Sequence, residues 1–441
     1  DPNYCHIYIH DLSPYIYTTD NKVVLIGGLR LGGACSMKCN YDPNMNNCSN
    51  PVNPPTDTCP DSTDTSKCVG LSEYYALDIT DPKNPKLLWE FTHSDLGFSF
   101  SGPGIIKTRD NKYHVVFGSG PVNYTAQFAN NENFTLKLFV VNLDSGELER
   151  KIDTGIKKAF AGRIFSEGLD IDGDGYTDYL AVGYTRQDGG YTSFKGGVLL
   201  LGGTKDGNSL RPFSSDISNW NYLDYSSLGT DVGPVTAKVE FMKCFDKWYM
   251  YVGTGRWFVK EDNWEVNKNT IFGIPVVIKN DTSGKYVDLD TGTQDVTDES
   301  HVDNICTQAQ NNIVRGWYIN LDSGEKIVTD PTITDSNLII FTSIKPNQDI
   351  CGMGGDTRVW TLNCATGGKP SGCSNGLFAI TDISGSILLQ LSGSDIRQIN
   401  LNTANSRSTN WYKGIAPENA PPLISYKQTK KKGEIILWIE R

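Results

Sequence analysis

Short runs of apolar residues, separated by polar turns that usually contain glycine, recur along most of this sequence. Four stretches share one form, in which an apolar strand is followed by Asp or Asn, a polar turn and a second apolar strand: residues 73–91, 138–152, 316–328 and 376–391. Apolar runs bounded by turn residues predict β-hairpins. Stretches with helical periodicity are absent. The pattern therefore predicts an all-β protein.

The repetition of related hairpins indicates how the strands are arranged. Roughly one unit recurs every 50–70 residues, which is typical of sheets repeated around an axis. A β-helix would need a shorter and stricter repeat, and a sandwich would not need this many related hairpins. We therefore predict a β-propeller of about six to seven blades. A chain of this length suits one large all-β domain, which we place over residues 1–441.

Residues 35–68 break the strand pattern. This stretch carries five cysteines and five prolines but almost no large apolar residues, so it cannot build a core of its own. We interpret it as a surface insertion held by disulfides, with Cys5 available as a sixth partner. The spacing of Cys35 and Cys39 leaves zinc as an alternative, although the segment contains no histidine. Its five cysteines are Cys35, Cys39, Cys48, Cys59 and Cys68.

Composition narrows the class of protein further. The net charge of −11 and the pI near 5.0 argue against nucleic-acid binding, which needs a basic surface. No apolar run approaches the length of about 18 residues that crosses a bilayer. Eleven cysteines are typical of an exported protein. The sequence begins at Asp1-Pro2 without a signal peptide, which we interpret as a processed or truncated start.

The strongest candidate for chemistry is the stretch "DIDGDGYTD" at residues 170–178. Its alternate carboxylates, with Gly175 at the sharp turn, match the first nine positions of a calcium loop. A helical EF-hand would need Glu at position 12, where Ala181 stands in a run of strand character, so we predict a calcium site between strands. Without a cation, four carboxylates this close would repel one another. The predicted ligands are the side chains of Asp170, Asp172, Asp174 and Asp178 and the carbonyl of Tyr176.

Several motifs occur together in a known family. The chain contains "VVLIGGLRLGG", "YYALDITDPKNPKLLWEF" and "SDLGFSFSGPGI", then "LFVVNLDSGE", "DIDGDGYTDYLAVG", "GTGRWF", "GWYINLDSGEKIVTDP" and "DICGMGGDTRVWTLN". In this order they resemble the C-terminal domain of PilY-type adhesins, the large proteins carried at type IV pilus tips. The likeness runs from about residue 20 to the closing "IILWIER".

The resemblance implies a modified propeller with one calcium ion held by the acidic loop. It also implies a role at the cell surface, at the pilus tip or in the periplasm or outer membrane. The expected partners are minor pilins or tip subunits and a host or abiotic surface, and the expected processes are pilus biogenesis, twitching motility and attachment. Two departures from the family stand out: the insertion at 35–68, and the lack of the first blade and of the large N-terminal region, which predicts an incomplete N-terminal end.

An enzyme is the alternative of a different class. The hairpin pattern also resembles quinoprotein dehydrogenase propellers, which use a vicinal disulfide and a regular tryptophan-bearing repeat. No two cysteines are adjacent here, and the nine tryptophans are not regularly spaced. We expect Cys351, Cys364 and Cys373 to be structural disulfides or buried thiols rather than nucleophiles. The sequence thus predicts a calcium-binding, non-enzymatic adhesin or assembly factor, with no catalytic residues.

Overall fold

The computed structural model describes most of the chain, with gaps. The described residues are 10–30, 72–122, 133–190, 193–258, 262, 268–282, 284–347, 354–380, 385–392, 394–400, 406–417 and 423–425. The predicted insertion at 35–68, Cys5 and Cys351 lie outside these ranges. The predictions made for them therefore stay predictions.

The described strands form six sheets, and the first three are four-stranded antiparallel sheets. Sheet 1 contains β1 (Tyr15–Thr18), β2 (Val23–Gly28), β3 (Tyr74–Asp78) and β4 (Lys86–Phe91). Sheet 2 contains β5 (Gly104–Lys107), β6 (Tyr113–Gly118), β7 (Thr135–Asn142) and β8 (Leu148–Lys157). Sheet 3 has the order β14 (Asn221–Tyr225), β11 (Phe194–Gly202), β10 (Leu180–Gln187) and β9 (Ala159–Ala161).

The last three sheets contain the remaining strands. Sheet 4 contains β12 (Lys205–Asp206), β13 (Ser209–Leu210), β18 (Gly284–Leu289), β17 (Thr270–Asp281), β16 (Lys247–Gly253) and β15 (Glu240–Cys244), with β19 (Gln294–Asp295) and β20 (Trp317–Asn320) beside β17. Sheet 5 contains β21 (Thr332–Ile333), β22 (Leu338–Pro346), β23 (Gly355–Asn363) and β26 (Tyr412–Lys413). Sheet 6 contains β25 (Ser394–Asn400), β24 (Ser386–Leu391) and β27 (Leu423–Ser425).

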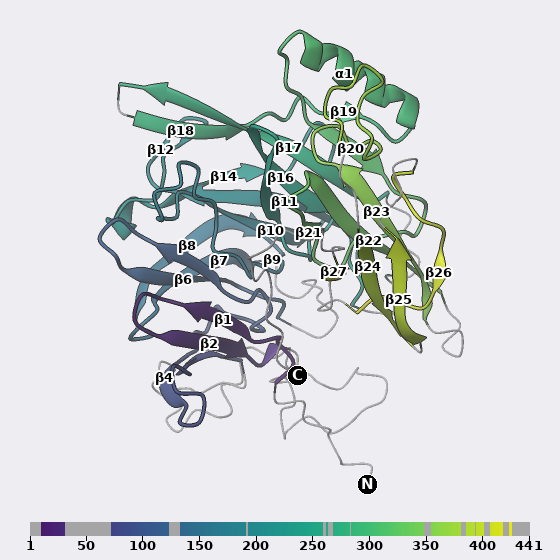
Figure 1. The fold of residues 1–441 in the computed structure, drawn as a ribbon. Coiled ribbons are helices and arrows are strands. Elements are labelled where there is room, and N and C mark those ends of the chain that lie inside the picture. Colours follow the sequence, from purple (N-terminus) through teal and green to yellow (C-terminus); the bar gives the residue numbers. More distant parts are fainter. Residues whose placement is uncertain are drawn as a thin grey trace, which may run out of the picture.

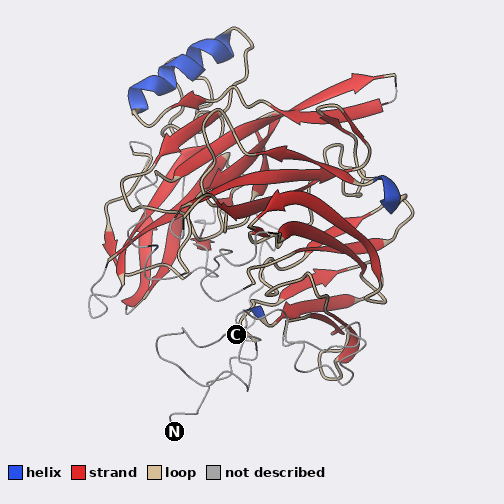
Figure 2. Ribbon diagram, turned by 180° about the vertical axis from the view of Figure 1, so that it is seen from behind, coloured by secondary structure: helices blue, strands red, loops and turns tan. Residues whose placement is uncertain are grey.

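The sheets follow one another in chain order as an arc (Figure 1). The first strands lie at the lower left of that view, the middle strands above them and the last strands at the right. Strands dominate the fold in the view from behind as well (Figure 2). The predicted all-β class is confirmed. Closure of a propeller ring and the number of blades stay predictions.

Consecutive sheets pack against each other through hydrophobic side chains, and an inner strand contributes side chains to a cluster on each of its two faces. In β16, Tyr249 and Tyr251 pack into the cluster shared with sheet 5, whereas Met250 and Val252 pack into the cluster shared with sheet 3. Successive side chains of a strand point to opposite faces, so a strand buried on both faces reads as a continuous apolar run. Five such clusters link sheets 1 to 6 in order. The strands between two clusters are therefore buried on both faces by the neighbouring sheets.

Two of the four predicted hairpins are confirmed and two are wrong. Residues 73–91 and 138–152 form the hairpins β3–β4 and β7–β8. In 316–328 only β20 is a strand, and the chain then crosses to sheet 5, where Lys326 bridges Ile344. In 376–391 the described residues 376–380 and 385–391 contain one strand, β24, and residues 376–380 form turns. Phe378, in the first half of this stretch, has a φ of 55°, a left-handed conformation that is uncommon for any residue other than glycine and does not continue a strand.

Short helices were not expected from the sequence. The 3₁₀-helices η4 (Ile217–Asn219) and η6 (Glu299–His301) precede β14 and α1, and α1 spans Val302–Gln310. Asp298 caps η6 by accepting a hydrogen bond from the Ser300 amide, and η6 leads directly into α1. Cys306 of α1 forms a disulfide with Cys373. Nine residues are too few for a clear periodic pattern, which is why the helix was missed.

Candidate metal centre

The acidic loop lies in sheet 3, in the connection between β9 and β10. An isolated antiparallel bridge between Leu169 and Tyr179 closes the base of the loop. Gly173 and Gly175 have φ values of 74° and 83°, a left-handed conformation that favours glycine. The two glycines therefore let the chain curl within a few residues.

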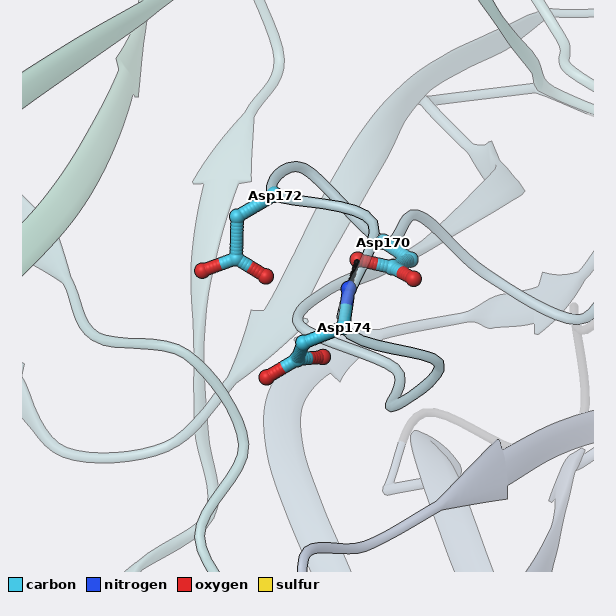
Figure 3. Close-up of side chains that lie close together, drawn as sticks. All are labelled: Asp170, Asp172 and Asp174. Carbon is cyan, nitrogen blue, oxygen red and sulfur yellow. Dashed lines mark hydrogen bonds between the residues drawn. The ribbon is translucent and has the colours of Figure 1, made fainter.

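Three of the predicted ligands meet in this loop. Asp170, Asp172 and Asp174 each offer a carboxylate oxygen, and these atoms all lie within 4.8 Å of one another (Figure 3). Oxygens bound to one calcium ion at 2.3–2.6 Å lie at most about 4.6–5.2 Å apart. The three carboxylates are therefore spaced closely enough for one such ion, and hard oxygen donors are the ligands that calcium prefers.

The loop backbone fixes the orientation of these carboxylates. Asp170 accepts hydrogen bonds from the amides of Gly173 and Gly175 at 2.7 and 2.8 Å. It also accepts one from the Asp174 amide at 3.3 Å (Figure 3). Asp174 in turn accepts a hydrogen bond from the Tyr176 amide at 3.0 Å. The turn is thus held in a curled shape by its own side chains.

The other two predicted ligands lie at the edge of this group. The carboxylate of Asp178 is buried beneath the loop, where it accepts a hydrogen bond from the Ile171 amide at 2.9 Å. Burial raises the pKa of Asp178, and the nearby charge of Asp172 adds to this effect. The Tyr176 hydroxyl donates to Asn111 at 3.2 Å, which ties the loop to sheet 2. The Tyr176 carbonyl stays a predicted ligand.

Two cations from the neighbouring sheets contact the acidic loop. Arg109, in the turn between β5 and β6 of sheet 2, lies 2.9 Å from Asp174 and 3.2 Å from Asp178. Lys285, in β18 of sheet 4, lies 2.8 Å from Asp172 and lowers the pKa of that carboxyl group. The loop of sheet 3 is therefore connected electrostatically to the sheets on either side of it.

These two cations could not be identified from the sequence. Arg109 is 65 residues from Asp174, and Lys285 is 113 residues from Asp172. No local motif joins them to the loop, because their proximity comes from the stacking of sheets 2, 3 and 4. In this structure they neutralise part of the negative charge that a metal ion would neutralise in the loaded loop.

A threonine, a histidine and a glutamate in sheet 2 are arranged like a hydrolytic triad. Nδ1 of His114 lies 2.6 Å from Glu149, and its Nε2 lies 3.2 Å from the Thr108 hydroxyl. Thr108 is only 1% exposed, and its hydroxyl donates to Asp110 at 2.6 Å. A substrate cannot reach this hydroxyl, so the group holds the β5–β6 turn rather than supplying a nucleophile.

A carboxylate-rich turn between strands, in a series of stacked sheets, defines the class as an all-β protein with an acidic loop. The comparisons with known proteins give a more particular similarity. No family model matches the chain. The chain is 26% identical over 209 residues to the type IV pilus biogenesis factor PilY1 of Pseudomonas aeruginosa strain UCBPP-PA14, an alignment that covers 43% of this chain and 17% of that protein. It is 32% identical over 119 residues to PilY1 of strain PAO1, covering 26% of this chain and 10% of that protein.

A further relative and a solved structure carry the same name. A PilY1 homolog of Xylella fastidiosa is 25% identical over 233 residues, covering 47% of this chain and 14% of that protein. The crystal structure of the Pseudomonas aeruginosa PilY1 C-terminal domain aligns with 86% of this chain and 73% of its own chain, at 18% identity and a TM-score of 0.49. The resemblance to PilY-type proteins is confirmed by the sequence alignments, which span at most 17% of these curated relatives.

A helix that spans a membrane needs a certain length and apolar character. None of the helices in the described part of the chain is long and apolar enough to span a bilayer. The α-helix found among the described residues, α1, has nine residues.

Proposed function

We propose that residues 170–178 bind one calcium ion through the side chains of Asp170, Asp172, Asp174 and Asp178 and the carbonyl of Tyr176. The observation that carries this proposal is the meeting of three carboxylates within 4.8 Å in a loop curled by two glycines. The ion supplies positive charge at the edge of sheet 3. It thereby favours one arrangement of the loop and of the contacts that the loop makes with sheets 2 and 4.

We further propose that the chain acts as a non-enzymatic surface module in type IV pilus assembly, motility and attachment. The similarity to proteins named type IV pilus biogenesis factors supports a pilus role. The calcium-stabilised edge would then determine which surface the chain presents to pilins, tip subunits or a substrate for attachment. A quinoprotein dehydrogenase is not favoured, because the sequence lacks the vicinal disulfide of those enzymes.

Calcium titration tests the metal site directly. We expect wild type to bind one calcium ion with a dissociation constant of about 10⁻⁶ to 10⁻³ M, because the loop lacks a bidentate glutamate. At 100 times that concentration, calcium should add about 2.7 kcal/mol to the free energy of unfolding. Asp174→Ala should abolish both effects, whereas Asp246→Ala, at a carboxylate that is 82% exposed on sheet 4, should change neither. Equal calcium binding by wild type and Asp174→Ala would place the site elsewhere.

The role of the metal in pili needs a cellular measurement. In cells that make this chain and assemble type IV pili, we expect Asp172→Ala to reduce twitching and attachment while the exported amount stays normal. The hydrophobic clusters between the sheets do not include this exposed side chain, so the strands should still form. Normal motility and attachment in a variant that has lost calcium binding would leave the ion with a structural role only.

A further inference from the structure

An open cleft of about 870 Å³ lies beside the acidic loop. It is bounded by the β5–β6 turn of sheet 2, the loop itself and the strands β12 and β18 of sheet 4. Its volume falls in the range of small-molecule sites, which is about 300–1,000 Å³. The charged residues that line it are Arg109, Asp172, Lys205, Asp206, Arg211 and Lys285.

Cations outnumber carboxylates among the residues that line the cleft, although the chain as a whole is acidic. Four of its charged residues are cations and two are carboxylates, whereas the whole chain carries a net charge of −11. A concave surface with one sign of charge concentrates ligands of the opposite sign. Ser214 and Ser215 also line the cleft, and the Ser214 hydroxyl donates to the Asp216 carbonyl at 3.1 Å.

Two of the cations, Arg211 and Lys205, form no ion pair with the acidic loop within the described residues. Arg211 pairs with Asp281 and donates a hydrogen bond to the Gly284 carbonyl at 2.8 Å, so its guanidinium is fixed beside the β17–β18 hairpin. Lys205 is exposed, and its ammonium lies 5.8 Å from the centre of the Tyr222 ring. Lys205 forms no ion pair with another residue in the described part of the chain.

The other two cations are engaged by the predicted calcium ligands. Lys285 pairs with Asp172, and Arg109 pairs with Asp174. If these carboxylates turn to a calcium ion, as the proposed function requires, both cations lose a partner and their charge becomes available to the cleft. Calcium binding therefore increases the positive charge of the cleft without any rearrangement of the sheets.

We propose that this cleft binds a small polyanion carrying sulfate or phosphate ester groups, and that calcium in the acidic loop tightens this binding. Arginine presents paired donors that match such oxyanions, and lysine supplies a mobile point charge. The coupling rests on the proposed function, whereas the cleft itself does not. Because linkage is reciprocal, the polyanion should tighten calcium binding by the same factor.

Titration with two probes tests the proposal. Sucrose octasulfate and fructose 1,6-bisphosphate represent sulfate and phosphate esters, and sucrose is the uncharged control. We expect saturable binding of at least one ester, tightened about 5-fold or more by saturating calcium, and the stronger probe identifies the ester. Lys205→Gln should weaken binding about 5-fold or more, through loss of a charge-assisted contact. Lys243→Gln, at an exposed lysine of β15 outside the cleft, should have no effect.

The outcomes separate this proposal from the calcium proposal. If wild type binds calcium but neither probe, the anion cleft is overturned and the calcium site stands. The same conclusion follows if wild type and Lys205→Gln bind the probes with equal affinity. A protein that binds a probe in a Lys205-dependent way but binds no calcium supports the cleft and overturns both the coupling and the calcium site. Calcium binding with probe affinities that calcium does not change overturns the coupling alone.

Discussion

Glu325→Ala is expected to lower the free energy of unfolding by about 3–5 kcal/mol, because it removes the buried carboxylate that pairs with the largely buried Arg358 guanidinium. Glu325 is fully buried, and its carboxylate accepts two hydrogen bonds from Arg358, at 2.7 and 2.6 Å. Ser343 donates to the same carboxylate, and the Trp360 indole N–H lies 3.3 Å from it. Glu325 follows β20 of sheet 4, whereas its partners lie on β22 and β23 of sheet 5, so the loss should weaken the junction between the two sheets.

The chain contains a matched control for this substitution. Residues 143–147 and 321–325 have the same sequence, LDSGE, and end in Glu147 and Glu325. Glu147 is exposed in the turn between β7 and β8, so Glu147→Ala should change the free energy of unfolding by no more than about 0.5 kcal/mol. Urea unfolding of both variants checks the prediction. A loss below 1 kcal/mol for Glu325→Ala would show that Arg358 finds other partners, such as Asp322 at 3.2 Å.

These two copies of LDSGE also show where sequence reasoning about the fold succeeded and where it failed. Both were predicted to be hairpin turns, and the first is one. The second leads the chain to the next sheet, because its glutamate pairs with an arginine 33 residues further on. A local sequence pattern can specify a turn, but it does not show a distant residue, such as Arg358, whose pairing accompanies the crossing of the chain to the next sheet. The apolar runs, in contrast, predicted strands correctly. A strand buried on both faces needs apolar residues at successive positions, and that pattern lies within the strand's own sequence.

The candidate site also has a part that the sequence predicted and a part that it did not. The spacing of Asp170, Asp172 and Asp174 lies within one loop, so it could be read from the sequence, and the structure brings these carboxylates together. The contacts of Arg109 and Lys285 with the loop could not be predicted from the sequence, because these residues belong to the two adjacent sheets. The loop of sheet 3 contacts sheets 2 and 4, so an ion bound there would act on the contacts with both sheets. Whether an ion binds there is decided by the titration proposed above.

Removing the Cys244–Cys364 disulfide is the second substitution with a large expected effect. We expect Cys244→Ala/Cys364→Ala to lower the free energy of unfolding by about 3–5 kcal/mol, because the bond closes a long loop and restricts the unfolded chain. The two cysteines are 120 residues apart and join the end of β15 in sheet 4 to the segment after β23 in sheet 5. The Cys364 carbonyl also accepts hydrogen bonds from Tyr251 at 3.1 Å and from the Trp317 indole at 2.9 Å.

The second described disulfide provides the comparison that tests this reasoning. Cys306 and Cys373 are 67 residues apart, so loop entropy predicts that Cys306→Ala/Cys373→Ala costs about 0.5 kcal/mol less than the first pair. Cys244 and Cys364 are buried among the side chains that join sheets 4 and 5, so thiol reagents should reach them only after unfolding. Urea unfolding of both double variants, with thiol labelling of reduced wild type, measures these quantities. A larger loss for the Cys306–Cys373 pair would mean that anchoring of α1, rather than loop length, governs the contribution of these bonds.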